Sequence, residues 1–347
     1  MTDVTPPPVS QPPAVTPAAA ATQKAELKRL EADLKAVMAD ALQVVRSSPQ
    51  LGQGKRSLYR VPWMLAVADA RAGLPQLLAA AAAFAPFPPP ARPQGAPPRP
   101  WDWWFFRDMV VIATTPEFLA EAEPGPTLRR AALGLIARHR PDRPLDAIAA
   151  VVSAELAASP AEAEAARRTG LRLRSVIDET SRQLRMRLPL TVIFDRLEAL
   201  PGFARFVGAL PSEVRAQAFG HRFDWQGNGG EVGDADVLRA LLDLRDRLYG
   251  VRLTLLKDAT QQPVRRDVFQ CVEAIAGLEE GIAGILHSLS DSNAFQRTAP
   301  LRGLYLAAAD PPAFVGDLAL RFLPVDARLA RREKAGGWLR LRRKRAA

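Results

Sequence analysis

The sequence predicts an α/β fold in which a parallel sheet with flanking helices is joined to an α-helical extension. Short apolar runs at 61–67, 109–114, 145–153 and 188–194 are typical of strands that are buried on both faces. Segments with helical periodicity separate these runs, and this alternation is typical of a parallel sheet with crossover helices. From residue 234 the pattern is helical for more than fifty residues, which predicts the extension.

The composition is that of an ordinary globular protein. The chain has 347 residues, of which 48% are hydrophobic and 24% are charged. Its one cysteine, Cys271, excludes an intramolecular disulfide and favours a reducing compartment. We expect neither a signal peptide nor a membrane span, because no stretch reaches about 18 apolar residues.

The amino-terminal part predicts a disordered lead followed by one amphipathic helix. Residues 1–22 are mostly Pro, Ala, Val and Thr and cannot bury enough apolar surface to fold. From 23 to 47 apolar residues recur at steps of three and four, and Pro49 ends that pattern.

Further helices are expected from Leu74 onward and over 128–138, 161–186, 234–258 and 264–290, with a last strand at 300–307. The expected organisation is a lead (1–22), a helix and linker (23–54), an α/β domain (55–225), a helical extension (226–299), a returning strand with a short segment (300–327) and a basic tail (328–347).

The stretch 58–78 organises the α/β domain, because it predicts a strand, a tight loop and a helix in the order in which a P-loop holds phosphates. A working P-loop reads GxxxxGK[ST]. Here Ala68 and Gly73 stand at the two glycine positions, Leu74 at the lysine position and Pro75 at the hydroxyl position. The missing lysine would neutralise phosphates and the missing hydroxyl would bind Mg²⁺, so we expect no nucleotide cofactor. The alternative is that this stretch was never a P-loop.

Five segments in order resemble the cytoplasmic region of the IcmF/TssM family of type VI secretion. Residues 59–63 resemble its YxLPW lead, and residues 103–112 resemble its WWF strand before a DTAGR switch motif. Residues 138–145 resemble its RxRPRRPLNG stretch, residues 188–203 its strand ending in TKCD, and residues 300–305 its PLRGFYF strand. The resemblance covers about residues 25–335 and implies a P-loop NTPase-like fold.

The departures from the family pattern weaken the nucleotide site further. Ala113 stands where the switch aspartate would serve Mg²⁺, and Pro116 stands where a glycine amide would meet the γ-phosphate. The base-specificity TKCD corresponds to residues 195–198, which begin with Asp195 and keep only a terminal acid, Glu198. Three decayed motifs on intact apolar strands predict a pseudo-GTPase with no catalytic residues.

Other chemistry-bearing residues favour structural roles. His139, His221 and His287 are scattered and show no metal-ligand spacing, and Cys271 lies on an apolar helix face. The aromatic cluster at 101–106 leads into a buried strand, so core or interface packing is favoured over base stacking. Glycines at 227–230 follow no apolar strand and predict a hinge.

The basic tail carries most of the net charge of +10, with nine basic residues and one acidic residue over 328–347. Its membrane-surface candidates are Trp338, Arg340, Arg342, Arg343, Lys344 and Arg345. Attachment to anionic lipid is favoured, because the resemblance places a membrane helix just beyond this tail. A solvated end and non-specific nucleic-acid binding are the alternatives.

The expected function is a non-catalytic scaffold of the type VI secretion membrane complex at the cytoplasmic face of the inner membrane. The resemblance implies partners of the TssL/DotU family and baseplate proteins. The alternatives are an active GTPase or ATPase of the same fold and a basic nucleic-acid-binding protein. The latter predicts a basic body, whereas the excess charge lies in the tail.

Overall fold

The computed structural model describes residues 17–48, 57–83, 99–225, 232–290 and 299–333, with side chains from residue 25 onward. The strands are β1 (Trp63–Ala68), β2 (Trp101–Phe106), β3 (Met109–Thr114), β4 (Ala147–Ser153), β5 (Met186–Arg187), β6 (Leu190–Asp195), β7 (Phe219–Arg222), β8 (Leu301–Leu306), β9 (Ala308–Ala309), β10 (Pro312–Ala313) and β11 (Arg331–Arg332). The helices are α1 (Pro17–Ser47), α2 (Leu74–Ala82), α3 (Gly125–His139), α4 (Ala163–Leu184), α5 (Phe203–Ala209), α6 (Ser212–Ala216), α7 (Asp234–Asp258), α8 (Gln262–Ala276), α9 (Glu279–Ser290) and α10 (Leu323–Asp326).

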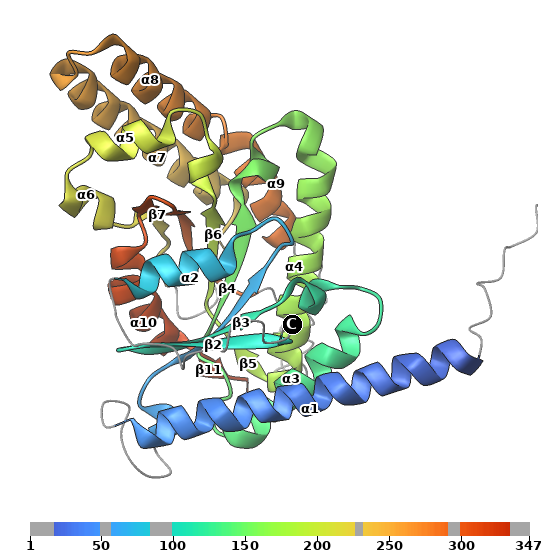
Figure 1. Ribbon diagram of the computed structural model, residues 1–347. Coiled ribbons are helices and arrows are strands. Elements are labelled where there is room, and N and C mark those ends of the chain that lie inside the picture. Colours follow the sequence, from blue (N-terminus) through green and yellow to red (C-terminus); the bar gives the residue numbers. More distant parts are fainter. Residues whose placement is uncertain (1–16, 49–56, 84–98, 226–231, 291–298, 334–347) are drawn as a thin grey trace, which may run out of the picture.

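A seven-stranded sheet with the order β2-β3-β1-β4-β6-β8-β7 forms the centre of the molecule (Figure 1). Its five inner strands are parallel, whereas β2 and β7 run antiparallel at the two edges. The α/β fold with a parallel sheet is therefore confirmed. The two antiparallel edges were not predicted, because strand direction depends on the path of the connections.

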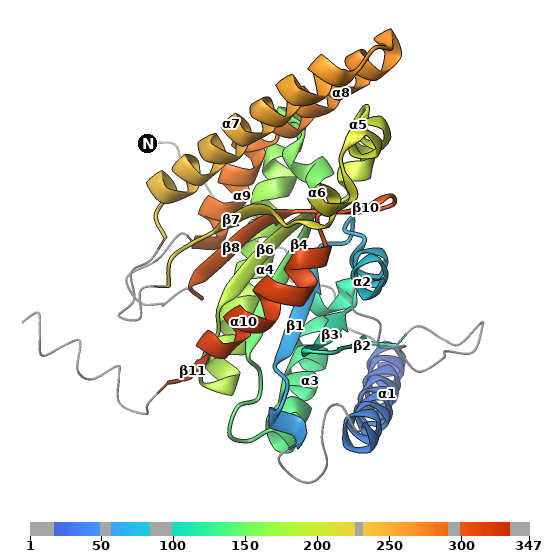
Figure 2. The ribbon, with the colours of Figure 1, turned by 90° about the vertical axis from the view of Figure 1, so that its left-hand side faces the viewer.

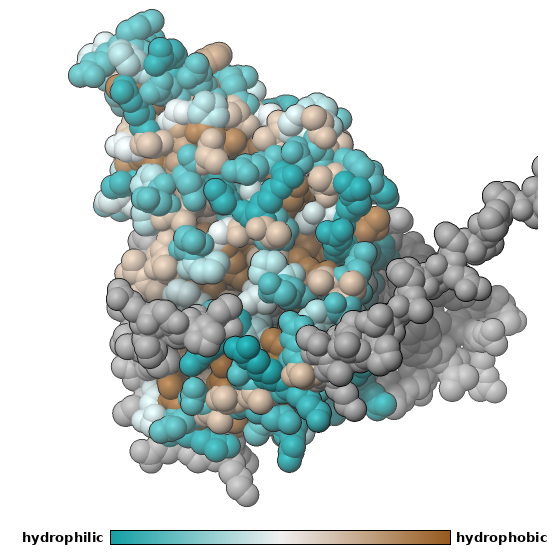
Figure 3. All heavy atoms as spheres, turned by 45° about the vertical axis from the view of Figure 1, so that its right-hand side comes forward, coloured by the Kyte–Doolittle hydropathy of each residue, from teal (hydrophilic) through white to brown (hydrophobic). Residues whose placement is uncertain are grey.

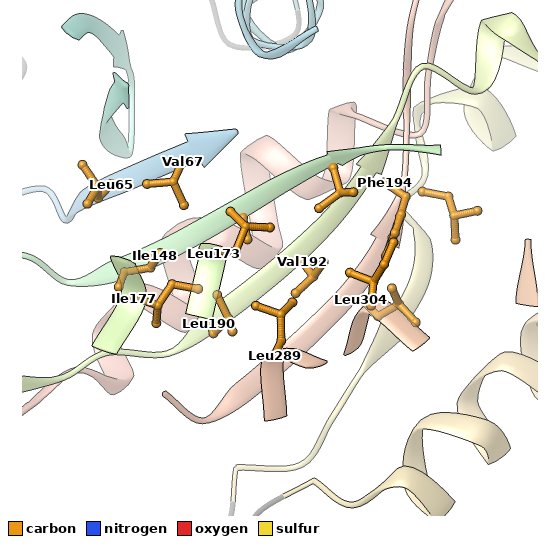
Figure 4. Packing of buried hydrophobic residues seen from close by; sticks show 14 of the residues in the cluster. Leu65, Val67, Ile148, Leu173, Ile177, Leu190, Val192, Phe194, Leu289 and Leu304 are labelled. Atoms are coloured by element: carbon orange, nitrogen blue, oxygen red, sulfur yellow. The ribbon is translucent and has the colours of Figure 1, made fainter. Parts of the chain in front are cut away.

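Two apolar layers cover the two faces of the sheet, because successive side chains of a strand point to opposite sides. Leu65 and Val67 of β1 belong to the larger layer, which includes side chains of α1, α3, α4 and α9. Figure 4 shows residues of this layer, in which Leu173 and Ile177 of α4 lie near the sheet. Met64 and Ala66 face the opposite layer, where α2 and the segment around α10 pack. Both faces are thus closed to water, as the apolar strands predicted.

The aromatic cluster at 101–106 forms edge strand β2, and its packing role is confirmed. Trp101 is fully buried, and Trp103 is 7% exposed. The ring of Trp103 meets that of Trp63 edge-on at 4.9 Å and that of Trp101 at 5.6 Å. These rings bind the edge of the sheet to the central strand, since edge-to-face pairs are favourable beyond their buried area.

The returning strand rejoins the sheet as predicted, because β8 pairs in parallel with β6. Strand β8 also supports β7, which pairs with it in antiparallel orientation. The polypeptide between β7 and β8 therefore leaves the sheet, forms the helical extension and comes back.

The helices α7 and α8 form a hairpin that projects from the α/β body (Figure 2). On the face shown in Figure 3, the projecting end is covered mostly by hydrophilic residues. The single helix expected over 264–290 is wrong, because α8 ends at Ala276 and α9 begins at Glu279. The break lets α9 turn back onto α4 at a close approach, where a Cβ added to Gly170 would lie 2.7 Å from Cβ of Ser288.

The amino-terminal helix α1 begins at Pro17, earlier than the expected start at residue 23. It lies beside α3 and next to edge strand β2 (Figures 1 and 2). The hinge expected at 227–230 and the membrane-surface residues from Trp338 to Arg345 lie outside the described residues. Among the described helices, none has the length and apolar character that a membrane span requires.

Candidate functional site at the carboxyl end of the sheet

The loop between β1 and α2 lies at the topological switch point of the sheet. Strand β3 lies on one side of β1 and β4 on the other, so the connections after β1 diverge there. In open α/β sheets, ligands bind in the crevice outside the carboxyl ends of the strands at such a point. The loop spanning residues 69–73 is therefore the place where a phosphate would be held.

Asp69 follows β1 directly and binds the backbone of its own loop and of β4. Its carboxylate accepts hydrogen bonds from the N–H groups of Arg71 and Ser153, both at 2.7 Å. Burial raises the pKa of Asp69, and the hydrogen bonds from Ser153, Arg71 and Ala72 oppose that shift. Asp69 was not predicted as a site residue, although an acidic residue directly after a buried strand is the signal that could have found it.

The side chain of Asp195 accepts the backbone N–H group that a bound phosphate would use. This residue ends β6, and its Oδ2 accepts the N–H of Gly73 at 2.6 Å, directly before the first residue of α2. Burial raises the pKa of Asp195 to about 7, with further contributions from the charges of Asp69 and Glu198 and an opposing one from the Gly73 hydrogen bond. A carboxylate at a helix N-terminus is stabilised by the same free N–H groups and helix dipole that bind phosphate. The chain thus places its own anion in the loop.

The side chains at the other P-loop positions offer no group that could bind a ligand. Leu74 is 3% exposed and packs in the apolar layer formed around α2, and Pro75 lies in the first turn of that helix. Ala68 is buried at the end of β1. Among the four positions compared with the motif, Gly73 donates its N–H to Asp195.

The segment at the switch position is bound tightly to the body. Ala113 is buried in β3 and pairs with Ala66, and Pro116 begins a short 3-10 helix. The Arg129 guanidinium donates to the carbonyl oxygens of Phe118 and Ala120, both at 2.8 Å, and to Glu179 of α4 at 2.7 Å. Arg129 is 6% exposed, so these bonds form in a place largely shielded from water.

The base-specificity position is also occupied by the chain itself. The Oε2 of Glu198 accepts the N–H of Ala309 at 3.4 Å. Arg196 has a left-handed backbone (φ 61°), and its Nη1 donates to the carbonyl of Arg71 at 3.1 Å. The positions compared with the P-loop and with the base-specificity motif therefore contact each other, through Asp195 and Gly73 and through Arg196 and Arg71.

The electrostatics of this crevice disfavour phosphate. Asp69 and Asp195 lie at the loop where a P-loop would present a lysine, and their ionised forms would repel a phosphate. The nearby Arg71 pairs with Glu162 at 3.0 Å, and Arg196 lies 3.8 Å from Glu155. In the parts of the chain that the structure describes, no group of three or more His, Cys, Asp or Glu is arranged to hold a metal ion.

The histidines and the cysteine lie apart from this crevice. The ring of His221 lies 4.7 Å from that of Phe223 in a tilted arrangement, and His287 contacts Asp234 at 3.0 Å on the surface. Cys271 is fully buried, and burial raises the pKa of its thiol to about 12, so it carries no nucleophilic thiolate at neutral pH. His139 lies on α3, at the other end of the molecule from the crevice loop.

Comparison with known proteins identifies the family. The model of the IcmF-related N-terminal domain matches residues 130–343, which is more than half of the chain. The chain belongs to the IcmF-related family. It is also 28% identical over 290 residues to the type VI secretion system component TssM1 of Pseudomonas aeruginosa, covering 80% of this chain and 26% of TssM1. This IcmF-related chain thus spans about a quarter of the length of the curated relative that it matches.

Proposed function

We propose that this IcmF-related chain is a pseudo-GTPase scaffold that works without binding or hydrolysing nucleotide. The observation that carries this proposal is the hydrogen bond between the Asp195 carboxylate and the Gly73 N–H. A phosphate would have to displace a buried carboxylate that already satisfies the amide, and it would find neither a lysine nor a hydroxyl at 74 and 75.

The proposal also covers the setting in which the scaffold works. TssM1, which it resembles, is a type VI secretion component, and on this similarity we place the chain in the membrane complex of such a system, at the cytoplasmic face of the inner membrane. Its partners would be the TssL/DotU-family subunit and baseplate proteins. Rigid surfaces suit docking, since little ordering entropy is then lost on binding, and the segment held by Arg129 supports such rigidity.

Nucleotide titration tests the central part of the proposal. We expect no change in melting temperature of the purified chain with about 1 mM Mg²⁺-GTP or Mg²⁺-ATP. A nucleotide that bound with a dissociation constant of about 10 μM would stabilise the fold by roughly 2.7 kcal/mol at that concentration, which a thermal melt resolves. Isothermal titration then checks the same point directly.

A matched variant makes a negative result informative. The variant with Ala68→Gly, Leu74→Lys, Pro75→Ser and Asp195→Ala restores the P-loop residues and removes the internal anion. If the unaltered chain binds either nucleotide at about 10 μM or tighter, the scaffold proposal is wrong and the active GTPase or ATPase is favoured.

A further inference from the structure

A groove between α1 and α3 has a cationic rim and an apolar floor, and it lies far from the crevice loop in the fold. It is a cavity of about 320 Å³. Its lining on α1 consists of Lys35, Met38, Ala39, Leu42 and Arg46, and its lining on α3 consists of Leu135, Arg138 and His139. The α1 residues follow one another at helical spacing and form one stripe about 16 Å long, at 1.5 Å per residue.

The floor of the groove is apolar. Met38 is 1% exposed and Leu42 is 5% exposed, and both belong to the main core layer. Ala39 is exposed beside them, and its small side chain leaves the space above the floor open. Two adjacent helices with such a seam match the helix-in-groove mode of recognition, in which a third amphipathic helix lays its apolar face between them.

The rim of the groove is cationic, and no described acidic side chain pairs with it. Lys35, Arg46 and Arg138 are exposed, and none of them forms an ion pair or hydrogen bond through its side chain with another described residue. Among the described residues, no acidic one lines the groove. The pKa of His139 is lowered, first by burial and then by the charges of Arg138 and Arg46. The guanidinium groups of the two helices therefore both lie close enough to His139 to disfavour its protonated form.

We propose that this groove binds an amphipathic helix of a partner protein whose apolar stripe is flanked by acidic residues. Charge complementarity selects the acidic flanks, because three unpaired cations rim a floor that lacks acids. A flat bilayer surface suits the groove less, since Met38 and Leu42 lie at the bottom of a hollow that a flat surface does not enter. The proposal deepens the scaffold role and rests on it.

The probe is a synthetic amphipathic peptide of about 18 residues, with leucines at i, i+3, i+4 and i+7 and glutamates on both flanks. A second peptide carries lysine in place of each glutamate. Binding to the full chain is measured by fluorescence anisotropy at low salt. We expect the acidic peptide to bind at least about tenfold more tightly than the basic one.

Matched variants locate the site. Ala39→Trp fills the groove and should weaken binding of the acidic peptide at least about tenfold, whereas Ala36→Trp, exposed on the same helix outside the groove, should leave it within about twofold. The double variant with Arg46→Glu and Arg138→Glu should also weaken binding of the acidic peptide at least about tenfold. Arg130→Glu, exposed on α3 outside the lining, controls for charge.

Several results would overturn the proposal. These are equal affinity for the two peptides, no saturable binding, or no effect of Ala39→Trp. Binding of anionic vesicles that Ala39→Trp abolishes, without peptide binding, would make lipid the occupant instead. Peptide binding only after deletion of residues 1–16 would make that segment the occupant. Nucleotide binding together with groove binding would refute the scaffold proposal alone, so the two failures are distinguishable.

Discussion

At the scale of single residues, buried carboxylates decide what the carboxyl end of the sheet can do. Asp69 holds the loop to β4, and Asp195 holds it to β6 through Gly73. The Oδ1 of Asp195 has no hydrogen-bond partner among the described residues, so this carboxylate is buried with one oxygen unsatisfied. Burying an ionised group in this way costs free energy, and the cost shows itself as a raised pKa.

Asp195 therefore predicts a specific pH dependence of stability. Its pKa is about 7 in the folded chain, against about 3.9 for an unperturbed aspartate. The unfolded chain loses this proton first, so the contribution of Asp195 to stability is complete below about pH 4 and is lost as the pH rises to about 7. The loss is on the order of 4 kcal/mol at most.

The variant Asp195→Asn removes this titration and keeps an oxygen that can accept the Gly73 N–H. The free energy of unfolding of the unaltered chain, measured with urea, should fall relative to that of the variant between about pH 4 and pH 7. Asp246→Asn, on the exposed surface of α7, controls for the loss of one negative charge. Parallel pH profiles for the unaltered chain and Asp195→Asn would contradict the prediction.

At the scale of elements, the returning strand β8 joins edge strand β7 to the rest of the sheet. It pairs with β6 on one side and β7 on the other. Leu304 and Leu306 of this strand are 0% and 3% exposed. Helix α9, which precedes β8, packs on α4 and covers the same face of the sheet. The α/β body is therefore not complete before residue 306.

We expect a truncation that ends at residue 230 to be insoluble. It removes β8 and α9, which leaves β6 at an open edge and exposes the core layer beneath α9, and unpaired apolar edges aggregate. Each buried leucine that is lost removes roughly 2 kcal/mol of burial free energy. A truncation at residue 333 is the control and should stay soluble. A soluble 1–230 fragment with a cooperative urea transition would show that β8 is dispensable.

At the scale of the whole molecule, charge is distributed unevenly along the chain. The last twenty residues carry nine basic side chains, and Trp338 stands among them. Tryptophan favours the headgroup layer, and arginines favour anionic lipid. Only the start of this stretch is described, where β11 pairs with β5 and Arg332 donates to the carbonyl oxygen of Pro141.

The tail predicts reversible, salt-sensitive attachment to anionic membranes. If four of its charges reach the surface, roughly 4 kcal/mol is available at about 1 kcal/mol each. The chain should float with anionic vesicles at low salt and leave them at about 0.5 M salt, where the Debye length is only a few ångströms. Deletion of 334–347 should abolish flotation while keeping β11. Equal binding to neutral vesicles, or no effect of the deletion, would show a solvated end.

The sequence by itself determined the features that depend on local patterns. It predicted β3 and α7 with the bounds that the structure shows, because apolar runs and helical periodicity are local properties. It also predicted that Leu74 and Pro75 do not support nucleotide binding, since a missing lysine and hydroxyl are visible in the sequence.

Only the tertiary structure decided which groups meet. Asp195 and Gly73 are 122 residues apart, and the parallel sheet brings them within hydrogen-bond distance. The groove between α1 and α3 likewise joins Arg46 and Arg138, and the break after Gly277 follows from the packing of α9 on α4. Local periodicity carries no information about such distant pairs, because the chain connections and side-chain packing bring them together.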